Sequence, residues 1–111
     1  MGRQAWRRAW SPAAQTLPTD ADQVAIAAMD GRWFEYHRLG HDHGPMAFRG
    51  VGTFALGGAG CERYWTIRDE RLRIAGDDGR LTMDLVATEN GGWEGAWLVH
   101  EKMGIGLKPR A

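Results

Sequence analysis

Three histidines within seven residues are the most suggestive chemical feature of this sequence. They are His37, His41 and His43, in an H-x3-H-x-H pattern. Imidazoles at such spacing can bind a divalent transition metal such as Zn²⁺, Ni²⁺ or Fe²⁺. The residues that would complete the shell are Cys61, Glu35 or His100. The alternative is that His41 and His43, beside a glycine and a proline, are solvated side chains of a polar loop.

A second candidate site consists of polar residues that alternate with tryptophans. Glu35 and His37 alternate with Trp33, and Arg63 lies two residues before Trp65. If these positions face inward, a carboxylate, an imidazole and a guanidinium line one cavity and bind the polar part of a ligand. Buried charge is unfavourable unless it is paired. The alternative is therefore an internal ion pair between Glu35 and Arg63.

Nucleophilic catalysis has little support in the sequence. Cys61 is the single cysteine, and as a nucleophile it needs a neighbouring base such as His37 or His100. A buried, inert thiol is the simpler interpretation. Ser11 is the only serine, and no phosphate-binding loop or dinucleotide fingerprint is present. The sequence therefore leaves open whether the protein is an enzyme.

The elements that position these residues are one helix and a series of strands. Residues 19–29 predict a helix that Thr19 caps, with Val24, Ala25, Ala28 and Met29 as its apolar stripe. From Gly31 onward the apolar pattern has period two. We expect strands near residues 32–39, 46–56, 61–68, 71–75, 80–88 and 93–100, and a further strand at 103–108.

The links between these strands are too short for crossover helices, so neighbouring strands should be antiparallel. Glycines within the strands, at Gly50, Gly52 and Gly95, favour sharp curvature. The predicted fold class is therefore all-β: a small antiparallel meander closing into a barrel, preceded by a short N-terminal helix.

Alternation also predicts which residues face inward. They are Met46, Phe48, Phe54 and Leu56; Cys61, Arg63, Trp65 and Ile67; Leu81, Met83, Leu85 and Ala87; and Trp93, Gly95, Trp97 and Val99. The outward residues would be Arg49, Thr53, Glu62, Arg68, Thr82 and Asp84. The polar character of this second set agrees with a solvent-facing surface.

A short helix followed by Gly31-Arg32-Trp33 at the start of a meander resembles the GxW opening of lipocalins and other calycin-like barrels. The resemblance implies a barrel that binds a small molecule inside. It also implies that Trp33 closes one end of the barrel and that a basic residue, Lys108 or Arg110, packs over its ring. The second motif and the disulfide usual in lipocalins are missing from this chain.

Composition narrows the classes of partner. The 111 residues carry 14 basic and 14 acidic side chains, so no basic excess favours nucleic acid. No apolar stretch is long enough for a transmembrane helix, and a cytoplasmic location is the expectation. Residues 1–18 predict a flexible basic and aromatic arm, and residues 19–111 a single barrel domain. Pairing of two chains would cover an exposed edge strand.

These observations favour a barrel that binds a small apolar or amphipathic molecule. Trp33, Phe48, Phe54, Trp65 and Trp97 would form the apolar wall, and Glu35, His37 and Arg63 the polar contacts. One alternative is a metal-dependent enzyme that uses His37, His41 and His43. Another is a protein-interaction module with a filled barrel that engages its partner through the arm.

Overall fold

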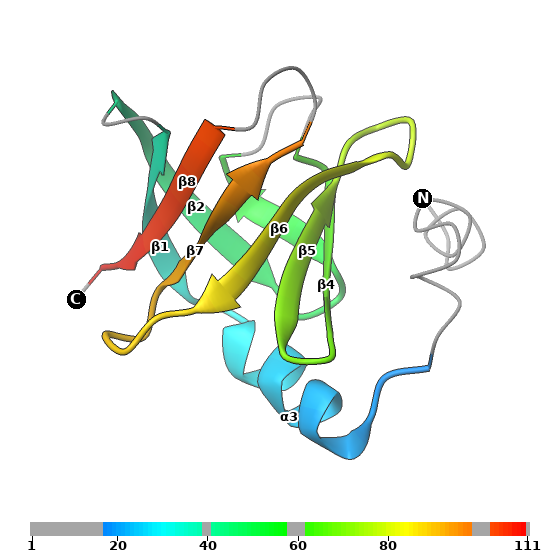
Figure 1. Cartoon of the computed structure of the whole chain (residues 1–111). Coiled ribbons are helices and arrows are strands. Elements are labelled where there is room, and N and C mark those ends of the chain that lie inside the picture. The colour runs from blue at the N-terminus through cyan, green and yellow to red at the C-terminus, as the bar shows by residue number, and fades with distance from the viewer. Residues whose placement is uncertain (1–16, 39–40, 58–61, 99–102, 111) are drawn as a thin grey trace.

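The computed structural model describes residues 17–38, 41–57, 62–98 and 103–110, and these form a nearly closed antiparallel barrel with one helix below it (Figure 1). The elements are α3 (Asp20–Met29), β1 (Trp33–Arg38), β2 (His41–Arg49), β3 (Thr53–Leu56), β4 (Tyr64–Arg68), β5 (Arg71–Ala75), β6 (Leu81–Ala87), β7 (Trp93–Trp97) and β8 (Met103–Pro109). This architecture confirms the predicted fold class.

The strand order is β3-β2-β1-β8-β7-β6-β5-β4. Strands next to each other in sequence are therefore paired throughout, except β3 and β4, and β8 returns to pair with β1. The seam between β3 and β4 is held by Trp65. Its backbone N–H donates to the carbonyl of Gly52 at 3.0 Å, and its indole Nε1 donates to the carbonyls of Arg49 and Thr53 at 3.0 and 2.8 Å. One residue, through its backbone and its side chain, thus bridges the only gap between the described strands.

The lower end of the barrel, where α3 lies, is filled by an aromatic cluster. Phe48 lies at its centre, with ring centroids 5.4 Å from Phe34, 5.0 Å from Phe54 and 5.3 Å from Trp65. The core continues along the barrel in fully buried side chains that include Met46, Ile67, Leu72, Ile74, Met83, Leu85 and Leu107. Packed aromatic and aliphatic side chains therefore fill the described interior.

The helix buries half of the predicted stripe: Met29 and Ala25 face the core, whereas Val24 and Ala28 are exposed. Val24 is 70% exposed, whereas Asp22 and Met29 are buried and Ala25 and Ile26 pack against the core. The stripe shifts because Asp22 has backbone partners on both sides. Its carboxylate accepts the Thr19 N–H at 3.1 Å in a capping box and the Asp69 N–H at 3.4 Å. The predicted helix itself is confirmed.

The burial of Asp22 is compensated by these hydrogen bonds. Burial alone raises the pKa of a carboxyl group. Here the Thr19 N–H and hydroxyl, with the backbone N–H groups of Asp69 and Glu70, outweigh burial and hold the pKa of Asp22 below its ordinary value of 3.8. Asp69 and Glu70 form the β4–β5 turn with φ of 52° and 64°. The ionised carboxylate therefore ties the helix to a turn in which two non-glycine residues adopt the left-handed conformation.

Two other predictions need correction. The strand expected at 46–56 is two strands, because the chain turns at residues 50–52. Gly52 has φ of 89° there, and its N–H donates to the Arg49 carbonyl at 3.0 Å. Glu62, Arg68 and Thr82 were expected to face solvent, yet each is at most 6% exposed.

Residues 1–16 of the predicted arm lie outside the residues that the structure describes. No helix in the described part of the chain is long and apolar enough to cross a membrane.

Candidate functional site

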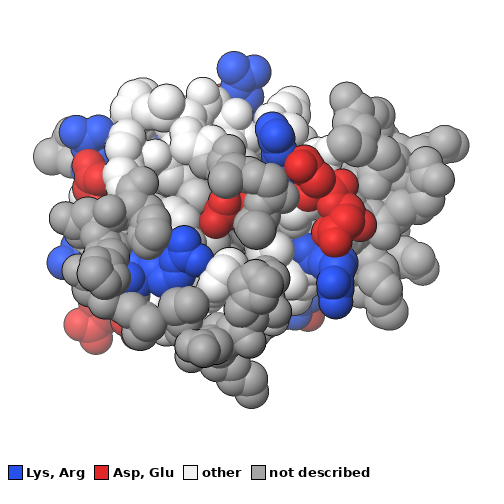
Figure 2. Space-filling model, turned by 90° about the horizontal axis from the view of Figure 1, so that it is seen from above, with Lys and Arg blue, Asp and Glu red and all other residues white. Residues whose placement is uncertain are grey.

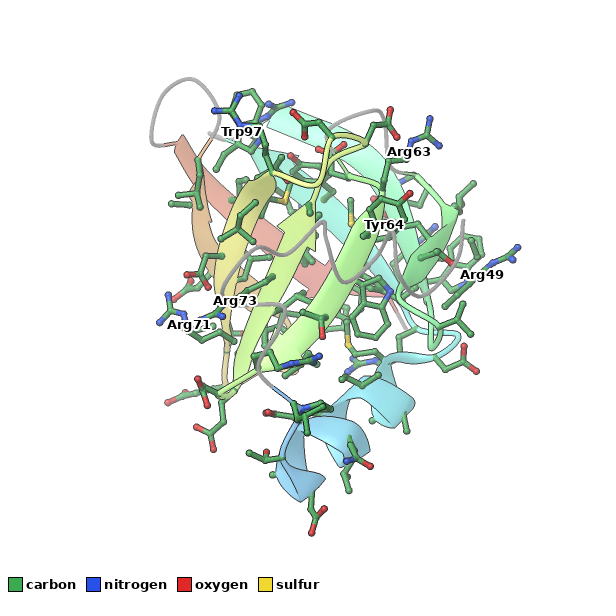
Figure 3. The ribbon with its side chains drawn as sticks, turned by 90° about the vertical axis from the view of Figure 1, so that its right-hand side faces the viewer. Arg49, Arg63, Tyr64, Arg71, Arg73 and Trp97 are labelled. Carbon is green, nitrogen blue, oxygen red and sulfur yellow. The ribbon has the colours of Figure 1, made fainter. Side chains whose placement is uncertain are left out.

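The candidate site lies at the upper end of the barrel, where β1, β3, β5 and β7 finish (Figure 1). Arg38 is the last residue of β1, Trp97 is the last residue of β7, and Glu62 immediately precedes the segment that leads into β4. Tyr36 lies one inward position below Arg38. We call these four residues the upper cluster. Figure 3 shows Trp97 at this end of the barrel, with Arg63 at the same level and Arg71 and Arg73 farther down.

The guanidinium of Arg38 lies over aromatic rings. Its Cζ is 4.3 Å from the ring centroid of Trp97 and 5.9 Å from that of Tyr36. Trp97 is 7% exposed and Tyr36 is 6% exposed, so the rings belong to the interior, whereas Arg38 remains half-buried. Stacking on aromatic faces orients a guanidinium.

A carboxylate completes the upper cluster. Glu62 is 6% exposed, and its Oε1 accepts a hydrogen bond from the Tyr36 hydroxyl at 3.4 Å. The upper end therefore combines a cation, a carboxylate, a phenol and an indole around the end of an otherwise apolar interior. Such a combination of apolar surface with a few convergent polar groups is typical of small-molecule sites.

The charge on this end is mixed. Figure 2, which looks down on the upper end, shows basic and acidic side chains interspersed among uncharged ones, with no extended surface of one sign among the described residues of this face. Recognition here would accordingly depend on individual groups such as Arg38 rather than on a general field.

The structure does not bring together the polar residues predicted to line the cavity. Phe34 and Tyr36 are the inward residues of β1, so Glu35 and His37 lie on its outer face. Glu35 pairs with Arg110, whose Nε is 2.9 Å from its Oε1. Arg63 pairs instead with Asp77 at 2.7 Å, and both side chains are more than half exposed. The inward placement and the Glu35–Arg63 ion pair are therefore both wrong.

Trp33 lies outside as well. It is 45% exposed, so it does not close the barrel end as the lipocalin resemblance implied. The basic partner is nevertheless present, because the Cζ of Arg110 is 5.8 Å from the centroid of its ring. The backbone N–H of Arg110 also donates to the Trp33 carbonyl at 3.0 Å. This pair clamps the end of the chain's last described strand onto the start of β1.

Of the residues predicted to form an apolar wall, Phe48 packs against both Phe54 and Trp65 in the aromatic cluster at the lower end. A ligand would have to displace these side chains to reach them. Trp97 alone among the predicted wall residues combines an inward position with a place at the upper end. The apolar surface available to a ligand is therefore narrower than the sequence suggested.

The histidine cluster is only partly described. The backbone register places His41 opposite Arg38 and Asp42 opposite His37. The side chains of His41 and His43, and the whole of Cys61 and His100, lie outside what the structure describes. Among the described residues, no group of three metal-ligating side chains comes together. The metal site stays a prediction.

Sequence reasoning missed Tyr36, Arg38 and Glu62. A signal for the first two existed: Phe34 is a better core residue than Trp33 is, and choosing it as the inward residue of β1 also turns Tyr36 and Arg38 inward. Glu62 carried no such signal, because its burial depends on contacts across the barrel.

No protein-family model matches the sequence, and comparison with curated proteins and with solved structures finds no match.

Proposed function

We propose that this protein is a calycin-like barrel that binds a small amphipathic molecule at its upper end. The observation that carries the proposal is the placement of Arg38, a half-buried cation stacked on Trp97 at an inward position of the barrel. A guanidinium carries five N–H donors in a rigid plane, and stacking on a ring fixes the orientation of that plane.

The ligand's chemistry follows from the groups present. A guanidinium donates to a carboxylate or phosphate through charge-assisted hydrogen bonds, which are about twice as strong as neutral ones. The rings of Trp97 and Tyr36 offer apolar surface next to that cation. An anionic group attached to a compact apolar body satisfies both. The body is expected to lie at the upper end, because Phe48, Trp65 and their neighbours occupy the lower interior.

The up-and-down order of eight strands, closed between β8 and β1, with a helix below, supports the calycin-like assignment. So does the Arg110 side chain over Trp33. Because the helix and the aromatic cluster fill the lower end, the upper end is the side from which a ligand would enter such a barrel.

The test is a calorimetric titration of octanoate, a simple amphipathic anion, into the protein and two variants. Arg38→Met removes the cation and keeps much of the side-chain volume. It should weaken binding by roughly ten- to one hundred-fold, as expected for a lost hydrogen bond to a charged group. Arg49→Met is the matched control, because Arg49 is exposed on β2 and away from the cluster. Equal affinity in all three proteins contradicts the proposal.

A further inference from the structure

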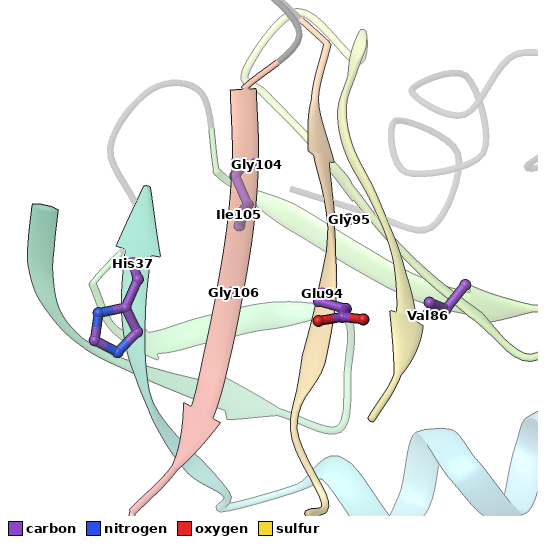
Figure 4. A pocket seen from close by; sticks show the side chains of 7 residues that line it. All are labelled: His37, Val86, Glu94, Gly95, Gly104, Ile105 and Gly106. Carbon is purple, nitrogen blue, oxygen red and sulfur yellow. The ribbon is translucent and has the colours of Figure 1, made fainter. Parts of the chain in front are cut away.

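A shallow groove runs over the outer face of β8, on the opposite side of the sheet from the interior (Figure 4). Its volume is about 550 Å³. The residues that line it are His37, Val86, Glu94, Gly95, Gly104, Ile105 and Gly106. We call it the β8 groove. It does not involve the upper cluster and would stand whether or not a ligand binds there.

The strand register explains the shape of the groove. His37 of β1 lies opposite Gly106 of β8, Gly106 lies opposite Glu94 of β7, and Glu94 lies opposite Val86 of β6. Neighbouring strands are about 4.8 Å apart, so the backbones of His37 and Glu94 are separated by about 10 Å. Figure 4 shows the imidazole and the carboxylate on either side of β8. The groove thus has a glycine floor and two polar walls.

Packing does not account for the two glycines of the floor. A Cβ at Gly104 would meet nothing within 4 Å, and one at Gly106 would meet only the Trp93 carbonyl oxygen at 4.0 Å. Neither residue has a positive φ. Gly95 differs, since a Cβ there would lie 2.2 Å from the Asp84 carbonyl oxygen. Glycine inside a strand lowers the stability of the sheet. Both positions have room for a side chain, so neither packing nor stability explains why they are glycines.

The walls define the chemistry of an occupant. Glu94 is exposed, and its carboxylate has no hydrogen bond or ion pair with any described residue. Val86, 40% exposed, adds apolar surface beyond it. A planar ring can lie flat on strand glycines, as aromatic side chains do when they cover glycines in sheets. A carboxylate at the rim favours a cationic group on that ring.

We propose that the β8 groove binds a small planar aromatic molecule that carries a protonated amine. The ring lies over Gly104 and Gly106 between the two walls, and the ammonium group pairs with Glu94. The charge of this ligand is opposite to that proposed for the upper end, so the two sites are distinguishable.

Tryptamine is the probe, and indole-3-acetate, with the same ring and the opposite charge, is its control. Titration followed by ¹⁵N NMR should shift the amides of Gly104, Gly106 and Glu94 with tryptamine, and much less with indole-3-acetate. Glu94→Gln should weaken tryptamine binding about ten-fold, as for the loss of a charge-assisted hydrogen bond. Glu89→Gln, which removes an exposed carboxylate elsewhere, should leave affinity unchanged.

The floor is tested by filling it. Gly106→Val adds a branched side chain for which the structure has room, so the variant should fold at least as stably as the parent. It should abolish the tryptamine-induced shifts, whereas Ala55→Val, at an exposed position of β3, should retain them. Undiminished binding to Gly106→Val, or shifts confined to residues outside the groove, would overturn the proposal. Absence of any shift with the parent protein at millimolar tryptamine would do the same.

Discussion

The two ends of this barrel are built from different kinds of residues. At the lower end, Phe34, Phe48 and Trp65 are at most 1% exposed, and a capped helix lies beneath them. At the upper end, Arg38, Tyr36 and Glu62 occupy positions that an apolar core would fill with leucine or phenylalanine. The lower end therefore holds the fold together. The upper end accepts polar groups that a core optimised for stability would exclude, which is typical of binding sites.

The largest effect on stability is expected from a substitution of Trp65, at the lower end. Trp65→Ala leaves a cavity among the aromatic rings and removes the two indole hydrogen bonds to the carbonyls of Arg49 and Thr53. We expect a loss of about 3–5 kcal/mol in the free energy of unfolding, measured with urea. Trp33→Ala is the matched control and should cost less than about 1 kcal/mol, because Trp33 is 45% exposed. Similar losses for the two tryptophans would remove the basis for calling the lower end the structural one.

A second effect concerns Asp22, which ties the helix to the β4–β5 turn. Asp22→Ala should lower stability by about 2 kcal/mol, since it removes the buried carboxylate that accepts the Thr19 N–H in the capping box and the Asp69 N–H of the turn. Asp20→Ala, in the same helical turn but exposed, should cost only about a few tenths of a kcal/mol.

The same carboxylate makes stability depend on pH. Because the pKa of Asp22 is lowered on folding from its ordinary value of 3.8, its contribution is complete above that value and is lost as the pH falls through the folded pKa. Unfolding midpoints should therefore converge for the parent and Asp22→Ala in strong acid and separate toward about pH 6. If the two midpoints differ by the same amount at every pH in this range, the ionised carboxylate of Asp22 does not cause the difference in stability.

A third, smaller effect is a gain. The β4–β5 turn places Asp69 and Glu70 at positive φ, where an asparagine followed by a glycine is the preferred pair. The double variant Asp69→Asn/Glu70→Gly should therefore raise stability by about 1 kcal/mol in a thermal melt. Glu89→Gly, in a turn where that residue has no positive φ, should lower it instead. A decrease in both variants would indicate that the acidic side chains of the turn contribute more than backbone strain removes.

The smallest effect is expected at the upper end. Arg38→Met should change the free energy of unfolding by less than about 1 kcal/mol, because Arg38 is only half-buried and methionine keeps apolar contact with the ring of Trp97. The loss should appear in ligand affinity instead. A destabilisation comparable to that of Trp65→Ala would make Arg38 a structural residue.

The sequence predicted the barrel better than it predicted the site. Period-two patterns with short links were enough for the antiparallel strands and the helix. Those patterns did not determine which residues of β1 face inward, because Trp33, Glu35 and His37 alternate as regularly as Phe34, Tyr36 and Arg38. A shift of one residue exchanges the two faces of a strand, so this choice decided the whole predicted site. The partners of Glu35 and Arg63, which are Arg110 and Asp77, depend on long-range register that no local pattern contains.

The most direct test of the central claim is native mass spectrometry of freshly purified protein beside the variant Arg38→Met/Trp97→Ala, each compared with its denatured mass. We expect the parent protein to carry an organic adduct, which its mass would help to identify, and the variant to have lost it. An adduct that persists in the folded variant, or a parent whose native and denatured masses agree even after incubation with octanoate, would contradict ligand binding at the upper end.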